Sequence, residues 1–173
     1  MSKDDAKKVL VVDDEEDVRD YLTMALMDAG FKVETASDGV EAMDLIKKSP
    51  PDLISLDLVM PRKSGVKLYR ELAKNPEWSN IPVLVVTGHA RDDLGRSDLN
   101  ELTMSGPGVY LEKPVKPTNY IAAVKKLLKM EITTDERKGI EQTRLQSELK
   151  DFIEEADPET LEELKRMMKK RKG

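Results

Sequence analysis

Short apolar stretches alternate along the chain with longer segments in which apolar residues recur every three or four positions. The short stretches are rich in β-branched residues and lack clean polar alternation, which is typical of strands buried on both faces of a parallel sheet. The longer periodic segments predict helices at 15–29, 40–48 and 66–74, between strands, and another helix starting at Lys116-Pro117. The five expected strands are 9–12, 31–35, 53–56, 81–86 and 109–111. This alternation predicts a doubly wound α/β domain over residues 6–130.

The fourth helix of this pattern is its weakest element. Residues 91–104 should supply it, but they contain Gly95 and six charged side chains. A turn-rich Ser105-Gly-Pro-Gly108 segment follows before the last strand. We therefore expect a poorly specified helix in this part of the domain.

Residues 131–173 form a strongly charged, helical C-terminal extension without strand signals. Leu145, Leu149, Phe152 and Ile153 give its first helix an apolar face. Asp157-Pro158 is typical of an N-cap followed by proline at the first helical position. We predict a helical hairpin with a basic, frayed tail. The apolar faces are compatible with packing on the first domain, a homodimer or a partner helix, and the sequence leaves these open.

Composition narrows the function classes. With 34 acidic and 29 basic residues, the net charge of −5 gives no general reason to bind nucleic acid. The chain has no cysteine, which excludes disulfides and thiolate metal sites. Its first apolar run, residues 9–12, is too short for a signal peptide or a membrane span. We therefore expect a cytoplasmic protein without membrane contact.

Polar residues follow four of the predicted strands. Asp13 and Asp14 follow the first strand, Asp57 the third, Thr87 ends the fourth and Lys113 follows the fifth. In a doubly wound sheet these positions meet at one edge, where ligand sites form. Each residue alone is also common at an ordinary strand end or turn. Their joint occurrence at one edge indicates a functional site.

This combination suits phosphoryl transfer. Three neighbouring carboxylates repel one another unless a cation compensates them, and Mg²⁺ prefers such oxygen ligands. Asp57 can act as the nucleophile that forms an acyl phosphate. Thr87 and Lys113 can then contact the phosphate oxygens.

Four segments resemble the motif set of the receiver domain of bacterial two-component response regulators. They are VLVVDDEE from Val9, DLISLDLVMPRKSG from Asp52, PVLVVTG from Pro82 and YLEKPVKP from Tyr110. The resemblance covers about residues 6–130. It implies a flavodoxin-like fold of the CheY type, with five parallel strands in the order 2-1-3-4-5.

The resemblance implies a role for each site residue. Asp13 and Asp14 would hold Mg²⁺, or Mn²⁺, together with Asp57 and the backbone carbonyl of Val59. Asp57 would be phosphorylated by a sensor histidine kinase or a phosphotransfer protein.

Thr87, at the end of the fourth strand, and Tyr110, on the fifth strand, would act as the switch. Thr87 would move to the phosphate, and Tyr110 would rotate into the space that Thr87 leaves. Lys113 would form a salt bridge to the phosphate, its approach directed by a cis bond to Pro114. His89, like Val59, is a candidate for tuning the lifetime of the phosphoryl group, although a solvent-facing histidine is the simpler interpretation.

Two departures from the family concern the output. Thr87 and Lys113 are 26 residues apart, a longer spacing than is typical, so we expect a remodelled partner surface there. Residues 131–173 are too few for the winged-helix domain common in this family, so we expect an output through an unidentified protein and not through DNA.

The leading prediction is a signalling phosphoacceptor that dephosphorylates itself slowly and is not an enzyme toward other substrates. One alternative is an aspartyl-phosphate hydrolase of the haloacid dehalogenase type, but that family has a second aspartate where this chain has Val59. Another alternative is a receiver-like interaction module that works without phosphorylation.

Overall fold

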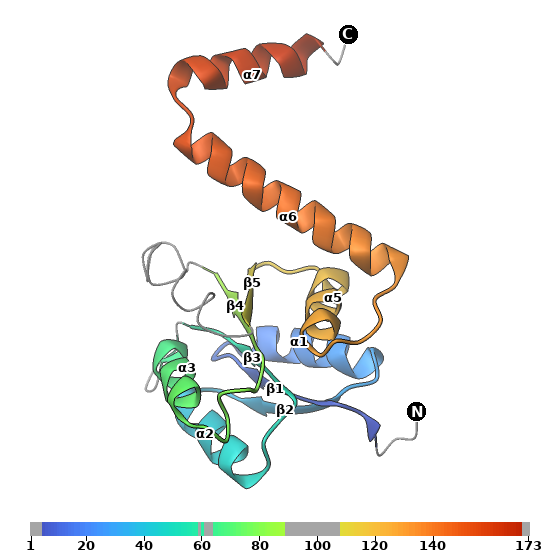
Figure 1. Cartoon of the computed structure of the whole chain (residues 1–173), viewed down its shortest axis with the longest axis vertical. Helices are drawn as coiled ribbons and strands as arrows, with labels where there is room; N and C mark the ends of the chain where they lie inside the picture. Colours follow the sequence, from blue (N-terminus) through green and yellow to red (C-terminus); the bar gives the residue numbers. More distant parts are fainter. Residues whose placement is uncertain (1–4, 59, 61–63, 89–107, 171–173) are drawn as a thin grey trace.

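The computed structural model describes residues 5–58, 60, 64–88 and 108–170, and its centre is a five-stranded parallel sheet (Figure 1). The strand order is β2-β1-β3-β4-β5. The predicted fold class and the predicted order 2-1-3-4-5 are therefore confirmed. The strands are β1 (Lys8–Val12), β2 (Lys32–Ala36), β3 (Leu53–Leu56), β4 (Val83–Thr87) and β5 (Gly108–Glu112).

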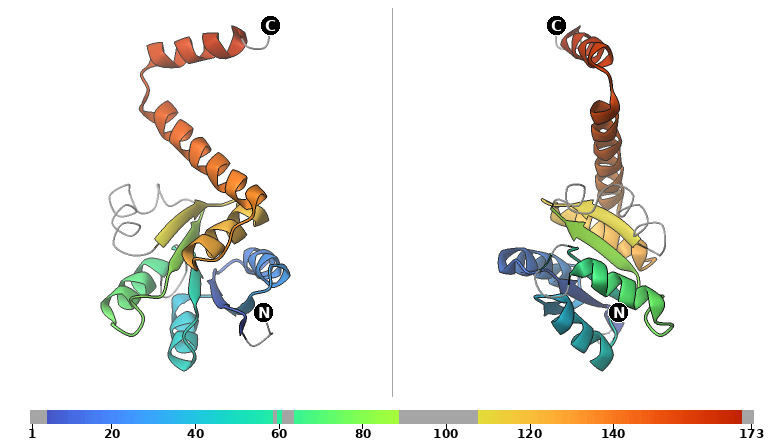
Figure 2. Two further views of the ribbon diagram at one scale, coloured as in Figure 1. Left: turned by 45° about the vertical axis from the view of Figure 1, so that its right-hand side comes forward. Right: turned by 90° about the vertical axis from the view of Figure 1, so that its left-hand side faces the viewer.

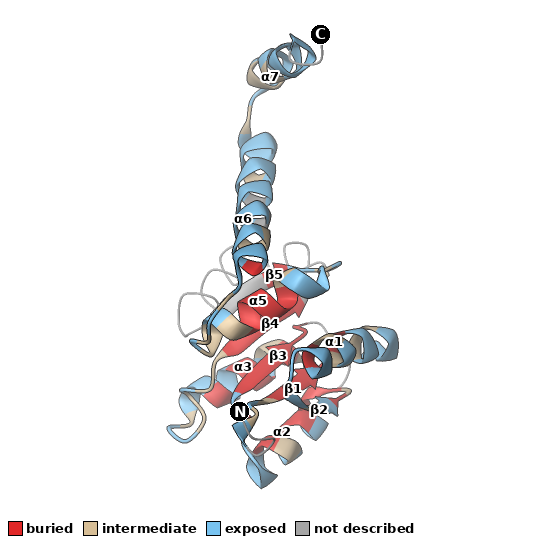
Figure 3. Ribbon diagram, turned by 90° about the vertical axis from the view of Figure 1, so that its right-hand side faces the viewer, coloured by how far each residue is buried: buried red, intermediate tan, exposed pale blue. Residues whose placement is uncertain are grey.

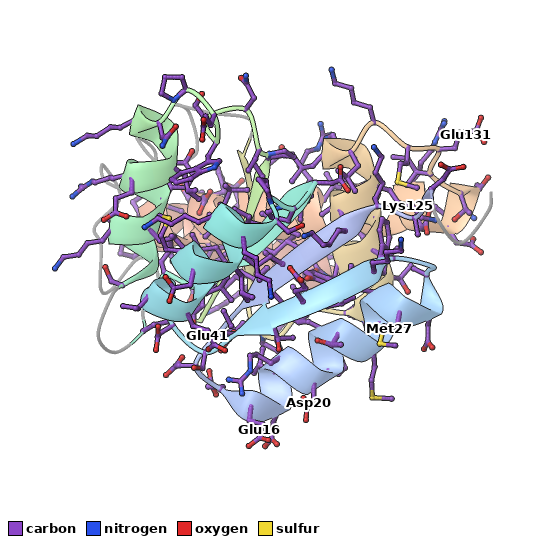
Figure 4. All side chains as sticks on the ribbon, turned by 90° about the horizontal axis from the view of Figure 1, so that it is seen from below. Glu16, Asp20, Met27, Glu41, Lys125 and Glu131 are labelled. Carbon is purple, nitrogen blue, oxygen red and sulfur yellow. The ribbon has the colours of Figure 1, made fainter. Side chains whose placement is uncertain are left out.

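Helices cover both faces of the sheet (Figure 2). One face packs against α1 (Glu16–Asp28) and α5 (Pro117–Leu127), and the other against α2 (Gly39–Lys48) and α3 (Gly65–Lys74). The solvent side of α1 carries Glu16, Asp20 and Met27, which point away from the sheet in Figure 4. The helices predicted at 15–29, 40–48 and 66–74 thus form within one residue of their expected bounds, and α5 begins at Pro117 as predicted.

Alternate residues of β1 and β4 enter different cores. Val9 and Val11 of β1 join the core under α1 and α5, whereas Leu10 and Val12 join the core under α2 and α3. All four side chains are at most 1% exposed. Burial on both faces explains why the strands lack polar alternation.

The ends of the helices follow local sequence signals. Gly30, with φ of 91°, lies just past the end of α1, where a left-handed residue is favoured. Asp38 caps α2 by accepting hydrogen bonds from the amides of Val40 and Glu41. Ser64 caps α3 by accepting one from the amide of Lys67. These caps begin each helix directly beside the sheet edge that carries the polar residues.

Two helices follow the sheet domain, α6 (Thr134–Glu155) and α7 (Pro158–Lys170). The base of α6 packs on α5, where Lys125 Nζ donates a hydrogen bond to Glu136 Oε1 at 2.9 Å. Figure 4 labels Lys125 close to where the chain leaves α5. Farther along α6, Lys150 Nζ lies 3.5 Å from Glu112 Oε1 of β5. Contacts with the sheet domain therefore extend from the start of α6 as far as Lys150, and the end of the helix projects away (Figures 1 and 3).

The predicted hairpin packing of the extension is not found. Both helices form, and Asp157 caps α7 by accepting a hydrogen bond from the amide of Thr160 at 2.8 Å. However, α7 leaves the end of α6 at an angle and does not lie along it (Figure 2). The reason is local, because Ala156 is extended (φ −72°, ψ 139°) and the Asp157 cap starts α7 in a new direction.

The Lys125–Glu136 contact should make the docking of α6 depend on pH. Burial raises the pKa of Glu136, but the hydrogen bonds from Lys125 and Thr133 outweigh it and hold this pKa below its ordinary value. Because the folded-state pKa is depressed, the stabilisation is complete above the ordinary value and is lost as the pH falls through the folded value. We therefore expect the protection factors of the α6 amides near Glu136 to drop only as the pH falls below 4.5, the ordinary value of a glutamate, measured by hydrogen exchange.

A matched pair of variants separates this contact from general acid effects. Glu136→Gln should lower the protection at pH 7 and reduce its pH dependence. Glu141→Gln, which changes an exposed glutamate on the same helix, should retain the wild-type pH dependence. Equal pH dependence in both variants would contradict the assignment.

Part of the prediction lies outside the described residues. This holds for the weak helix at 91–104 and for the turn segment up to residue 107. Within residues 5–58, 64–88 and 108–170, no helix is both long and apolar enough to cross a membrane.

Candidate functional site

The parallel register brings three polar side chains to one edge of the sheet. Val12 of β1 pairs with Leu56 of β3, so the next residues, Asp13 and Asp57, lie side by side. Beyond β4, Lys113 follows the last residue of β5. The predicted meeting of these residues at the carboxyl edge is what the structure shows.

Lys113 joins the acidic residues into one cluster. Its Nζ lies 2.7 Å from Asp13 Oδ2, 3.3 Å from Asp57 Oδ2 and 3.2 Å from Glu15 Oε1. Asp13 is 1% exposed and Asp57 is 5% exposed. Two buried carboxylates thus share one ammonium group, which offsets their mutual repulsion.

Burial and charge shift the pKa values in this cluster. Burial raises the pKa of Asp13, and the hydrogen bond from Lys113 offsets this only in part. For Lys113, burial acts to lower the pKa, but the hydrogen bond to Asp13 and the charges of Asp57 and Asp13 outweigh it and raise the pKa. Lys113 is therefore a permanent cation in the site at physiological pH.

Two residues that the sequence analysis did not single out orient Asp13. The backbone amide of Glu15 donates to Asp13 Oδ1 at 2.9 Å. The guanidinium of Arg19 donates to the Asp13 carbonyl oxygen at 2.8 Å from the first turns of α1. In the sequence, the only signal for this role of Glu15 and Arg19 is their position shortly after Asp13 and Asp14.

The donor set of the cluster fits a hard divalent cation. Carboxylate oxygens of Asp13, Asp14, Glu15 and Asp57 lie within 4.8 Å of one another. Asp14 and Glu15 are exposed, so the group opens to solvent on one side. Mg²⁺ prefers a few carboxylate oxygens with the remaining positions filled by water or phosphate. Lys113 Nζ contacts Asp13, so the Asp13 carboxylate would be shared between Lys113 and such an ion.

Gly65 is a further residue on which the site depends. A Cβ atom at this position would come within 2.7 Å of Leu58 Cα and still closer to the Asp57 carbonyl oxygen. The Gly65 amide donates to the Leu58 carbonyl oxygen at 3.1 Å. The start of α3 can therefore approach the end of β3 and Asp57 only because Gly65 lacks a side chain.

The remaining predicted residues are placed in part. Thr87 ends β4 and pairs with Glu112, and Tyr110 pairs with Val85, but their side chains are outside the described part of the structure. Val59 and His89 also fall outside it. The peptide bond between Lys113 and Pro114 is cis.

Comparison with known proteins identifies this arrangement. The family model "Response regulator receiver domain" matches residues 9–125. The chain belongs to the response regulator receiver family. This match contains the acidic pair, Asp57 and Lys113, so the cluster lies inside the receiver domain, whereas α6 and α7 follow it.

Two curated relatives illustrate the sequence similarity. Response regulator MprA of Mycobacterium sp. (strain KMS) is 38% identical over 122 residues, which is 70% of this chain and 50% of that protein. MprA of Mycobacterium avium (strain 104) is 35% identical over 136 residues, or 79% of this chain and 57% of that protein. The chain spans about half the length of these relatives.

Solved structures show the same fold. The receiver domain of Francisella response regulator 1452 is 31% identical, with a TM-score of 0.62, over 71% of this chain and 97% of that one. Chemotaxis protein CheY4 of Vibrio cholerae is 29% identical, with a TM-score of 0.63, over 70% and 98%. Each comparison covers nearly the whole of the solved chain.

Proposed function

We propose that this chain is a two-component response regulator in which Asp57 accepts a phosphoryl group in a Mg²⁺-dependent reaction. The main support for this proposal is the cluster around Asp13, Asp57 and Lys113 at the edge of the sheet. It places two buried aspartates, an exposed pair of further carboxylates and one lysine within contact distance. Membership of the receiver family supports the same conclusion.

Each residue of the cluster has a separate role in the proposed reaction. The Asp57 carboxylate attacks the phosphorus of a phosphohistidine on a sensor kinase or phosphotransfer protein, and the phosphorus–nitrogen bond breaks as the acyl phosphate forms. Asp13 and Asp14, with Asp57, would hold Mg²⁺, which supplies charge for the transferring oxygens. Lys113, already 3.3 Å from Asp57, would form a salt bridge to the new phosphate.

The proposed output is a protein contact. In this proposal the conformational change passes through Thr87 and Tyr110 to an unidentified downstream protein, and slow hydrolysis of the acyl phosphate resets the switch. The chain would act in the cytoplasm as a signalling phosphoacceptor without turnover of other substrates. We do not propose an aspartyl-phosphate hydrolase of the haloacid dehalogenase type, because the chain belongs to the receiver family.

A phosphodonor experiment tests the proposal. Incubation with Mg²⁺ and acetyl phosphate should add the mass of one phosphoryl group, measured on the intact protein. Asp57→Asn should abolish the gain, because an amide is not a nucleophile for this transfer. Asp44→Asn, which changes an exposed aspartate on α2, should leave it unchanged.

The other outcomes have defined meanings. No mass gain in the wild type, together with no spectral response to beryllofluoride, would favour an interaction module that works without phosphorylation. A gain that persists in Asp57→Asn would move the phosphorylated residue elsewhere. Removal of Mg²⁺ with EDTA should suppress the gain in the wild type, as expected if the carboxylates hold the ion.

A further inference from the structure

The far half of α6 has an exposed apolar stripe. Leu145, Leu149, Phe152 and Ile153 are between 46% and 55% exposed. Their spacing of three and four residues places them on one side of the helix. Large apolar side chains gathered in this way mark a contact surface more often than scattered ones do.

This stripe points away from the side of α6 that is docked on the receiver. The docking contacts come from Glu136 to Lys125, from Gly139 against Asn119 and from Lys150 to Glu112. At 3.6 residues per turn, these three positions centre about 120° around the helix from the stripe. The docking of α6 therefore leaves the stripe uncovered in the same molecule (Figure 3).

A second exposed apolar surface lies on α7. Met167 and Met168 are 62% and 70% exposed, and Leu161 and Leu164 are partly exposed beside them. No residue of α7 is buried. Because α7 diverges from α6 (Figure 2), it does not cover the α6 stripe of its own chain.

The charges around these apolar surfaces are segregated along the chain. Residues 148–163 contain eight acidic side chains and one lysine, whereas residues 164–173 contain six basic side chains and no acidic one. Two copies aligned in parallel would place like charges together. Two antiparallel copies instead place the basic end of each along the acidic stretch of the other.

We infer that two copies of this chain pair in antiparallel fashion through α7 and the far half of α6. The segment is complementary to itself in charge, and this favours a second copy over an unrelated helix. The extended residue at Ala156 turns α7 away from its own α6, which favours pairing between chains over closure within one. The result is a closed two-fold dimer with the receiver domains at opposite ends. This inference does not depend on phosphorylation of Asp57.

Analytical ultracentrifugation of the full chain tests the dimer. At micromolar concentrations the mass should be twice the 19.5 kDa of one chain. Phe152→Glu puts a charge in the stripe and should raise the dimer dissociation constant at least about tenfold. Met24→Glu, which changes a 66% exposed methionine on α1, should leave the constant unchanged. Wild-type protein that stays monomeric at every concentration would overturn the inference.

A charge exchange between chains tests the antiparallel arrangement. One variant carries Lys165→Glu and Lys169→Glu, and the other carries Glu155→Lys and Glu159→Lys. Each alone should dimerise more weakly than the wild type, and an equimolar mixture should form a mixed dimer. A mixture that remains monomeric, while all four changes in one chain restore a compact monomer, would show that α7 binds its own α6 and would refute the pairing of copies.

Discussion

Replacing Lys113 by methionine should lower the free energy of unfolding of the metal-free protein by about 3 kcal/mol, because removing one partner leaves the other charges of a buried cluster uncompensated. Asp13 and Asp57 would lose the ammonium group that lies 2.7 Å and 3.3 Å from them. Methionine keeps most of the aliphatic stem, so the loss reports mainly on the charge. Urea denaturation in EDTA measures the effect.

Mg²⁺ distinguishes the charge effect from a packing defect. Since a divalent cation can replace the missing positive charge, saturating Mg²⁺ should recover most of the stability of Lys113→Met. The control is Lys74→Met on α3, an exposed lysine, which should change stability little with or without the ion. If Lys113→Met is as stable as the control in EDTA, the lysine does not hold the cluster together.

Gly65→Ala should destabilise the protein by about 2–3 kcal/mol, because the added methyl group meets backbone atoms that cannot rotate away. Those atoms are the Asp57 carbonyl oxygen and Leu58 Cα. The displacement reaches Asp57, the proposed phosphoacceptor, so we also expect weaker Mg²⁺ binding and slower phosphorylation by acetyl phosphate. Thermal unfolding and titration with Mg²⁺ measure the two effects.

Gly88 provides the matched control for this substitution. A Cβ atom there meets nothing within 4 Å, so Gly88→Ala should change the unfolding free energy by less than about 0.5 kcal/mol. Comparable losses in both variants would mean that the glycines act through chain flexibility. A loss confined to Gly65 would support the close approach of α3 to Asp57.

The sheet and the central part of the site could be predicted from local sequence. Buried β-branched stretches such as Val9–Val12 show which segments are strands, and Gly30 shows where a helix ends. The parallel sheet then brings Asp13, Asp57 and Lys113 together without any knowledge of side-chain positions. For this reason the cluster follows from the alternation of elements alone.

The features that were missed depend on contacts between distant segments. Gly65 signals a helix start in the sequence, but the neighbour that requires a glycine is the backbone of Asp57. The contact of Glu136 with Lys125 joins two helices whose docking face contains few apolar residues, so periodicity does not reveal it. The apolar stripes of α6 and α7 suggested a hairpin because each needs a partner, whereas the direction set at Ala156 separates them.

Because α6 is long, a small change in its tilt on the receiver domain would displace its far end by a larger distance. With 22 residues, the helix is about 33 Å long. Its start is docked on α5, and a further contact with the sheet domain is the exposed ion pair of Lys150 with Glu112. A tilt of about 10° at the start of α6 would move the far end by about 6 Å, if the helix stays straight. Because Glu112, which contacts Lys150 of α6, directly precedes Lys113, small adjustments around the acidic cluster would be magnified into a change in the separation of everything attached beyond α6.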